Sequence, residues 1–310
     1  NKLNAKGRKD CIMNNIKKEM TERAERLNEM LKDEEFKIAI KDCFKNNGMK
    51  TAFVLNSPDR NASPSVYQET VMSYPDDNEL LDVLRNIYRE NRTDNVDMEK
   101  MVSRENILST VKPKLVSKDN IENVIENELV YERYLDMLVL YYIEIEEFSK
   151  EGMTASYTLK EVNLACSGIS IEELHDVALK NIEKDYFIRN MSEVICEIMG
   201  MSPEEMEEET AQGNHGDEMK MLVISTASKT NGASAILSDR VLGKISEKME
   251  GDYYIIPSSI HECIAIPSDE VEPDEIRNMV MEVNDSQLEP EDRLTYSVYG
   301  YINGKLDIMQ

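Results

Sequence analysis

The spacing of apolar and polar positions predicts an amphipathic helix followed by a β-hairpin at the start of the chain. Between residues 6 and 33, apolar side chains recur at roughly helical intervals among charged ones. From Phe36 the period changes to strict alternation, which resumes after Asn46-Asn47-Gly48. An Asn-Gly pair supplies the positive φ values of a tight turn, so residues 36–55 are expected to form the hairpin.

The middle of the chain mixes helical and extended patterns. The clearest strand runs from Tyr134 to Ile145, where alternate residues form one apolar face, and Met153–Leu159 is its expected hairpin partner. Asp136 lies on the opposite face of that strand, among other apolar residues. The helices expected in this part are 65–73, 78–92, 118–127, 170–184 and 187–199.

The last third of the chain continues the same mixture. Strands are expected at 219–226 and 233–237, around Pro257, and in a final hairpin at 296–308, with helices at 238–249 and 273–284. No regular strand–helix–strand repeat occurs. The sequence therefore predicts an α+β fold, with mainly antiparallel sheet and several hairpins packed against amphipathic helices.

Residues 201–217 change the composition of the chain and predict an acidic linker or loop. They are rich in glutamate and contain few apolar side chains. This segment would divide an N-terminal α+β lobe at 1–200, which holds the first helix, the hairpin and the central strand pair, from a C-terminal α+β lobe at 218–310. A single continuous domain with a long loop is the alternative.

Net charge limits the partners that the protein can take. The chain of 310 residues carries a formal net charge of −25, although residues 1–46 hold more basic than acidic side chains. Such a surface repels phosphate backbones and anionic lipids, so neither direct nucleic-acid binding nor a membrane partner is expected. Solubility explains this charge, and docking to a protein with a basic surface, including mimicry of nucleic acid, is the sharper interpretation.

The cysteines predict a cytoplasmic protein with reduced thiols. The five are scattered and form no Cys-x-x-Cys motif, so a disulfide framework is not indicated. The opening residues do not resemble a secretory signal. The longest apolar run, Met137–Ile143, is far too short to cross a bilayer.

Nucleotide and metal motifs are missing from the sequence. Neither glycine-rich phosphate-binding pattern occurs. His261-Glu262 begins like a zinc-protease motif, but Ala265 stands where the second histidine would be, and the three histidines are never spaced as a ligand pair. We therefore expect no cofactor and no metal site.

The segment Tyr253–Pro267 has two short apolar strands around a Pro-Ser-Ser break, with polar side chains at the junction. Ser258, Ser259, His261 and Glu262 are the candidate binding residues there. His261 and Cys263 would share a strand face at roughly 6–7 Å, which is too long for a base–thiol hydrogen bond. The preferred interpretation is a turn at residues 257–259, a core Cys263 and a partly buried His261 with a local hydrogen bond.

Asp136 is the other candidate, because a carboxylate in an apolar strand is costly unless it is paired. A structural ion pair, for example with Arg133, competes with a functional role. Convergence of Asp136, His261 and Glu262 across the sheet would indicate a hydrolase or nuclease-like enzyme.

Six blocks of sequence occur in an order that resembles a known family. They are Lys45–Gly48, Pro64–Tyr67, Tyr134–Met137, Gly168–Leu174, Asn231–Ala233 and Pro257–Glu262. Together they are similar to an uncharacterised family of anaerobic Gram-positive bacteria, catalogued as domain of unknown function 5688. The resemblance covers nearly the whole chain and implies a bacterial, cytosolic protein that forms one compact unit. It implies no activity and no functional residue.

The leading hypothesis from the sequence is a non-enzymatic protein-binding or regulatory module with a strongly acidic surface. It rests on the absence of a complete reactive motif and on amphipathic helices suited to protein partners. The enzyme using Asp136, His261 and Glu262 is the alternative. An acidic inhibitor that mimics nucleic acid is the second alternative.

Overall fold

The structure, a computed structural model, describes residues 2–91, 95, 97–145, 155–202 and 220–309. The chain forms two compact units. The first unit comprises Asn1–Met101 with Ile145–Ala155, and the second comprises Val102–Glu144 with Ser156–Gln310. Each unit has its own sheets and core and is described by itself.

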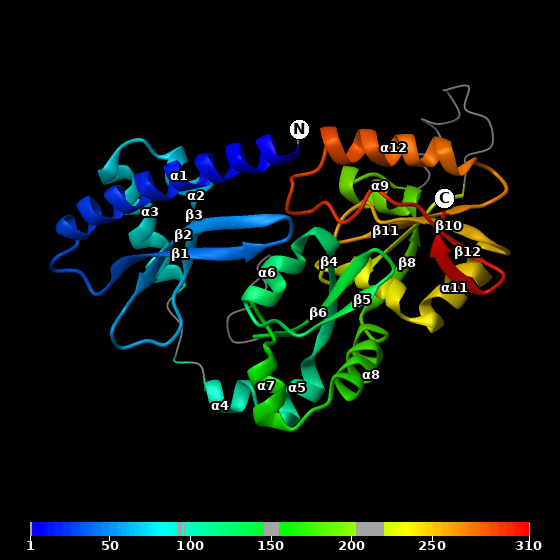
Figure 1. The fold of residues 1–310 in the computed structure, drawn as a ribbon, viewed down its shortest axis with the longest axis horizontal. Coiled ribbons are helices and arrows are strands. Elements are labelled where there is room, and N and C mark those ends of the chain that lie inside the picture. Colours follow the sequence, from blue (N-terminus) through cyan, green and yellow to red (C-terminus); the bar gives the residue numbers. More distant parts are fainter. Residues whose placement is uncertain (1, 92–94, 96, 146–154, 203–219, 310) are drawn as a thin grey trace. The chain divides into compact units, whose positions relative to one another are not determined.

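The first unit combines a three-stranded antiparallel sheet with helices (Figure 1). The strands follow the order β1-β2-β3. The elements are α1 (Lys2–Met30), β1 (Lys37–Lys45), β2 (Gly48–Asn56), β3 (Ser65–Tyr67), α2 (Gln68–Ser73), α3 (Asp77–Glu90) and α4 (Met98–Met101).

The hairpin of β1 and β2 confirms the sequence prediction for residues 36–55. Its pairing runs from Lys37 opposite Asn56 to Lys45 opposite Gly48. Asn47, in the turn, adopts a φ of 62°, the left-handed conformation that asparagine tolerates well. The turn therefore sets the register of the whole hairpin.

The core of the first unit lies between α1, α3 and the hairpin. Apolar side chains from each of these elements form one buried cluster, which includes Leu27, Leu31, Phe36, Phe53, Leu80 and Leu84. Arg23 is buried beside it. Its guanidinium donates to Asp77 at 2.8 Å and to the carbonyl oxygens of Val71 and Tyr74, so the buried charge is fully partnered.

The second unit contains two antiparallel sheets. One has the order β4-β6-β5 with β7 on β6, and the other has the order β13-β12-β10-β11-β9-β8. The elements up to β9 are α5 (Arg104–Thr110), β4 (Lys112–Ser117), η1 (Lys118–Asn120), α6 (Ile121–Glu126), β5 (Tyr131–Tyr134), β6 (Met137–Glu144), β7 (Ser156–Thr158), α7 (Glu161–Ser167), α8 (Ile171–Ile182), β8 (Tyr186–Asn190), α9 (Met191–Met199) and β9 (Leu222–Thr226). The remainder are η3 (Gly232–Leu237), α11 (Asp239–Met249), β10 (Tyr253–Ile256), β11 (Cys263–Pro267), α12 (Pro273–Ser286), β12 (Tyr299–Ile302) and β13 (Lys305–Ile308).

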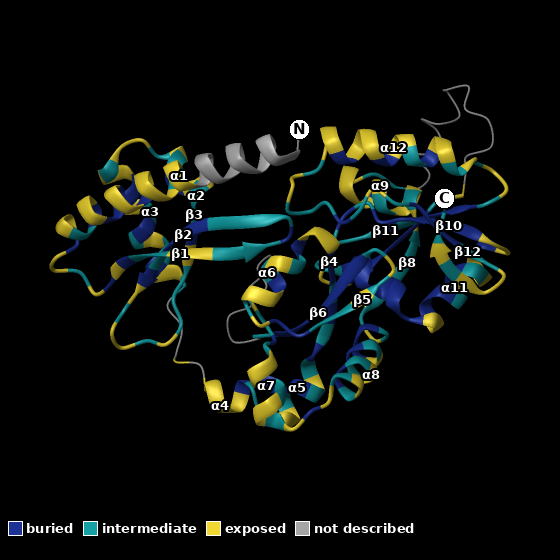
Figure 2. Cartoon of the chain, viewed as in Figure 1, coloured by how far each residue is buried: buried dark blue, intermediate teal, exposed yellow. Residues whose placement is uncertain are grey.

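This architecture confirms the α+β class with antiparallel sheet. Every strand pair within the described residues is antiparallel. The strand β6 is buried from Met137 to Ile143 and appears as a dark band in Figure 2. Both of its faces are covered, which explains why the sequence there is a continuous apolar run.

The compact units follow boundaries other than the predicted lobes at 1–200 and 218–310. Strands β8 and β9 lie on either side of residues 201–217, yet they pair with each other in one sheet, with Ile188 opposite Ile224. Most of the predicted acidic linker lies outside the described residues.

Two local predictions in the second unit are wrong. Residues 233–237 form part of the 3₁₀ helix η3, not a strand. The predicted helix at 187–199 begins only at Met191, because residues 186–190 pair with β9 as strand β8. In both places the tertiary contacts override the local pattern.

Candidate functional site

The loop between β10 and β11 closes on itself through its two serines. The hydroxyl of Ser258 donates to the carbonyl oxygen and to the carboxylate of Glu262, at 3.3 Å each. The hydroxyl of Ser259 accepts from the backbone N–H of His261 at 3.0 Å, and Ser259 is buried. Both hydroxyls therefore hold the turn that the sequence predicted at residues 257–259.

Both ring nitrogens of His261 are engaged. Nδ1 accepts from the backbone N–H of Asn231 at 3.2 Å. Nε2 lies 3.3 Å from Oδ1 of Asp292. These partners assign the proton of the neutral ring to Nε2 and leave no free lone pair for general-base chemistry.

The backbone around His261 is also anchored. Its carbonyl oxygen accepts from the hydroxyl of Ser225 at 2.7 Å. The N–H of Ile260 donates to the carbonyl oxygen of Asp292 at 2.8 Å, and its own carbonyl oxygen accepts from Ala233. The loop is thus fixed to β9, to η3 and to the segment before β12.

Cys263 is a core residue, as the sequence predicted. Its side chain is fully buried, and its thiol lies 3.8 Å from the carbonyl oxygen of Ala233. Burial raises the pKa of the Cys263 thiol strongly, and the nearby carboxylate of Glu262 adds to this effect. The neutral thiol is therefore a packing group.

Asp136 lies in the turn between β5 and β6, so the prediction that it belongs to a strand face is wrong, because the chain turns at Leu135-Asp136 before β6 begins. It is held by three hydroxyl groups. Its carboxylate accepts from Ser297 at 2.9 Å, from Thr295 at 3.1 Å and from the phenol of Tyr299. The ammonium group of Lys118 lies 3.7 Å away, so the ion-pair partner is Lys118 and not Arg133.

The pKa of Asp136 reflects two opposing effects. Partial burial acts to raise the pKa of this carboxyl group. The hydrogen bonds from Tyr299, Ser297 and Thr295, with the charge of Lys118, outweigh burial and hold the pKa below its ordinary value. Asp136 is therefore ionised at neutral pH.

The candidate residues gather in two separate sets of contacts. Those of Asp136 lead to Lys118 and to residues 295–299. Those of His261 lead to Asn231 and Asp292. Within the described part of the chain, no hydrogen bond or ion pair joins His261 to Asp136 or to the Glu262 carboxylate.

A third polar cluster, which the sequence did not indicate, joins Glu132, Tyr141 and His175. The buried phenol of Tyr141 donates to the Glu132 carboxylate and lies 2.7 Å from Nδ1 of His175. That nitrogen is also 2.9 Å from Glu132. Burial, followed by the hydrogen bond to Glu132, raises the pKa of Tyr141 well above its ordinary range. No spacing along the chain could reveal this cluster, because the three residues come from β5, β6 and α8.

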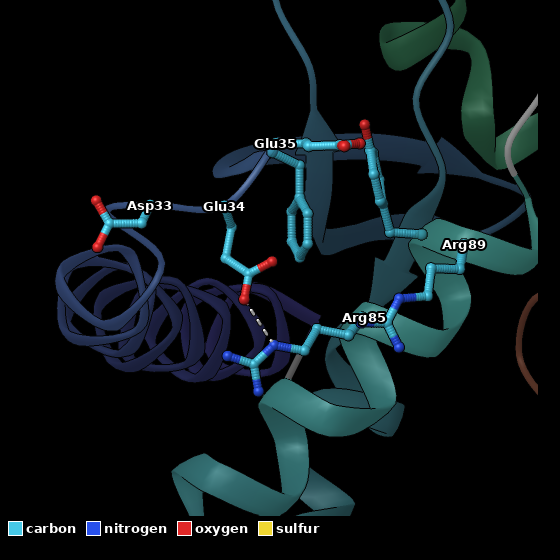
Figure 3. A pocket seen from close by; sticks show the side chains of 7 residues that line it. Asp33, Glu34, Glu35, Arg85 and Arg89 are labelled. Atoms are coloured by element: carbon cyan, nitrogen blue, oxygen red, sulfur yellow. Dashed lines mark hydrogen bonds and ion pairs between the residues drawn. The ribbon is translucent and has the colours of Figure 1, made fainter.

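A pocket of ≈ 320 Å³ lies in the first unit, beside the N-terminal end of β1 (Figure 3). The residues that line it come from the connection between α1 and β1 and from α3: Asp33, Glu34, Glu35, Phe36, Arg85, Tyr88 and Arg89. No sequence pattern indicated this pocket either, because charged residues near a helix end are common on solvated surfaces.

The helix α9 exposes a contiguous apolar stripe. Ile195, Ile198 and Met199 are spaced three and four residues apart on one helical face, and Ile198 is 75% exposed. Glu193 and Glu197, on the other side of α9, bind Arg189 of β8. We call Ile195, Ile198 and Met199 the α9 stripe.

The helices α9 and α12 cover the same face of the six-stranded sheet. Arg189, which binds α9, lies opposite Val223 in register, and Val223 lies opposite Ile264. Ile264 packs against the cluster that contains Ile276 and Val280 of α12. Residues opposite each other in register share a face, so both helices lie on it, as Figure 1 shows. On α12, Met279, Met281 and Val283 are also exposed.

The described residues show neither a candidate metal cluster nor a membrane-spanning helix. They contain no group of three or more His, Cys, Asp and Glu side chains that could hold a metal ion. None of the helices in these described ranges has the length and apolar character to cross a membrane.

These features define an α+β protein of antiparallel sheets in which internal hydrogen bonds hold the polar residues of the β10–β11 loop. The chain belongs to the family of unknown function DUF5688, whose model matches residues 13–303. This match confirms the resemblance found in the sequence. No curated protein and no solved structure matches the chain.

Proposed function

We propose that this protein is a non-enzymatic protein-binding or regulatory module with an acidic surface. The α9 stripe carries the proposal, because it exposes contiguous apolar area on a chain with a net charge of −25. Single exposed apolar residues are ordinary, whereas a contiguous group marks a candidate contact surface. Typical interfaces have an apolar centre of this kind within a polar rim.

The hydrogen bonds of the candidate residues support a structural role for them. His261 uses both ring nitrogens on Asn231 and Asp292, and Asp136 is saturated by hydroxyl groups. A general base needs a free lone pair within reach of substrate. The observed contacts instead suit a rigid scaffold that presents a surface.

The charge favours a partner with a basic surface. The chain as a whole carries a net charge of −25 and repels anions. Complementary charges would speed the encounter, while the apolar centre would set the lifetime of the complex. The cysteines of the described residues form no disulfide with one another, which supports a cytoplasmic location for this module.

The experiment compares binding by the wild type with binding by two matched variants. Ile198→Glu places a charge in the α9 stripe. Ile125→Glu places the same charge on α6, where Ile125 is 58% exposed. Each tagged protein is incubated with native cell extract, and bound proteins are quantified by mass spectrometry. Circular dichroism checks that all three are folded.

We expect the wild type and Ile125→Glu to enrich at least one basic protein from the extract. The amount of that protein recovered with Ile198→Glu should be lower by at least about tenfold. A partner set that all three proteins recover equally would contradict the role of the stripe. Turnover of a substrate that is abolished by His261→Ala would contradict the non-enzymatic assignment.

A further inference from the structure

The pocket of the first unit has an unusual distribution of charge. The Arg85 guanidinium is already paired with two carboxylates. Its Nε donates to Oε1 of Glu34 and its Nη1 to Asp82, at 3.0 Å each. Arg89 lies one helical turn further along α3 and lines the same pocket. In the described part of the chain, the Arg89 side chain forms neither a hydrogen bond nor an ion pair, although acidic residues greatly outnumber basic ones.

An acidic group faces the pocket from the other element. Figure 3 shows Glu34 in the connection after α1, with the dashed contact to Arg85, and Arg89 on the neighbouring helix. The contact to Arg85 uses Oε1 of Glu34, and Oε2 makes no hydrogen bond to another described residue. The pocket therefore offers Oε2 of Glu34 and the guanidinium of Arg89 to a ligand, with the carboxylates of Asp33 and Glu35 also in its lining.

Aromatic rings supply the apolar part of the wall. The rings of Phe36 and Tyr88 stack with their centroids 4.5 Å apart. The guanidinium of Arg60 lies over the same Tyr88 ring, 5.5 Å from its centroid. Both aromatic side chains are buried, so the wall is rigid.

We propose that this pocket binds a free α-amino acid with an apolar side chain. The ligand carboxylate would pair with Arg89, its ammonium group with Oε2 of Glu34, and its side chain would contact the edges of Phe36 and Tyr88. Arg and carboxylate groups are suited to such charge-assisted contacts. The volume of ≈ 320 Å³ is in the range of small-ligand sites, which begins at about 300 Å³.

Ligands of other charge fit less well. A simple anion would leave Glu34 facing it, and a simple cation would leave Arg89 unmatched. A nucleotide with several phosphates would meet Asp33, Glu34 and Glu35 together. A zwitterion offers a charge of the right sign to both Glu34 and Arg89. This inference is independent of the function proposed for the α9 stripe.

Calorimetric titration of the full chain tests the ligand class directly. The probes are L-leucine and L-phenylalanine, together with N-acetyl-L-leucine, which lacks the ammonium charge, and L-leucinamide, which lacks the carboxylate. We expect saturable binding of at least one of the two amino acids. If leucine binds, both of its derivatives should bind at least about tenfold more weakly than leucine itself. If phenylalanine binds, its N-acetyl and amide derivatives are compared with it in the same way.

Two arginine variants locate the site. Arg89→Gln should weaken binding at least about tenfold, because it removes the guanidinium charge. Arg133→Gln, an exposed arginine on β5, should leave it unchanged. The proposal is overturned if neither amino acid binds, if a derivative binds as well as its parent, or if Arg89→Gln binds like the wild type. Because Arg89 is exposed, both variants are expected to fold, which circular dichroism confirms.

Discussion

Asp136 shows how a carboxylate can remain ionised although it is largely buried. Its side chain is 14% exposed, yet three hydroxyl groups and Lys118 stabilise the charged form. The unfolded chain offers none of these contacts. The lowered pKa in the folded state therefore means that ionised Asp136 stabilises the fold.

We expect Asp136→Asn to lower the free energy of unfolding by about 1–3 kcal/mol at pH 7, because the hydroxyl groups lose a charged acceptor. The contribution of Asp136 is fully present above its unfolded pKa of about 3.9 and is lost as the pH falls through the lower folded value. The difference in the free energy of unfolding between variant and wild type should thus narrow below about pH 4. Urea unfolding at several pH values measures it.

Asp176→Asn is the control for this experiment, because Asp176 is exposed on α8. Asp176→Asn should change the free energy of unfolding by no more than about 0.5 kcal/mol. An equal loss of stability in the two variants, or a gap that widens in acid, would be inconsistent with this account of Asp136.

Burial predicts a clear order of reactivity among the cysteines. Cys166 is exposed, whereas Cys263 is fully buried and its thiol pKa is raised by burial. Because the thiolate is the reactive form, we expect native protein to be alkylated quickly at Cys166 and not at Cys263. Peptide mapping after iodoacetamide treatment measures both. Fast labelling of Cys263 would show that the β10–β11 region opens.

At the scale of elements, Gly232 allows η3 to approach the loop that holds His261. A Cβ atom at Gly232 would lie 2.4 Å from the carbonyl oxygen of His261 and 2.6 Å from the backbone nitrogen of Thr226. Backbone atoms on both sides cannot move independently of the sheet. The close approach therefore depends on the missing side chain.

We expect Gly232→Ala to destabilise the protein by about 1–3 kcal/mol or more through overpacking. Gly243→Ala is the matched control, since no atom lies within 4 Å of a Cβ built there and Gly243 is inside α11. It should be neutral or stabilise by up to about 1 kcal/mol, because alanine favours helix. Thermal unfolding compares the two, and equal effects would argue against the close packing of η3.

Elements with local signals were predictable from the sequence. The Asn-Gly turn identified the hairpin of β1 and β2, and Ser170 identified the start of α8, where its hydroxyl accepts from Glu173. The short strands β4 and β8 were not identified as strands, because their stability comes from pairing with distant strands. Such pairing leaves little trace in a local window.

The candidate residues were partly predictable for the same reason. Asp136 and His261 stood out as polar groups in apolar surroundings. Their partners, Tyr299 and Asp292, are distant in sequence and became visible only in the fold. The pocket around Arg89 was missed because its chemistry depends on the contact between Glu34 and Arg85 across two elements.

For the whole molecule, the net charge of −25 predicts a stability that rises with salt. Like charges repel in the compact state, and the Debye length falls from about 30 Å at 0.01 M to about 8 Å at 0.15 M ionic strength. We expect Tm to rise by at least about 2 °C over this range of sodium chloride. A constant or falling Tm in calorimetry would show that attractive ion pairs dominate.

The position of β13 at the end of the six-stranded sheet affects how copies of this protein behave at high concentration. An edge strand has backbone groups free to template another chain, and charged side chains discourage such addition. Lys305 and Asp307 are two residues apart on β13, and both are exposed. Nζ of Lys305 lies 3.1 Å from Oδ2 of Asp307. Replacing both with threonine should therefore promote self-association, seen by light scattering as growth in particle size, whereas the parent chain stays dispersed.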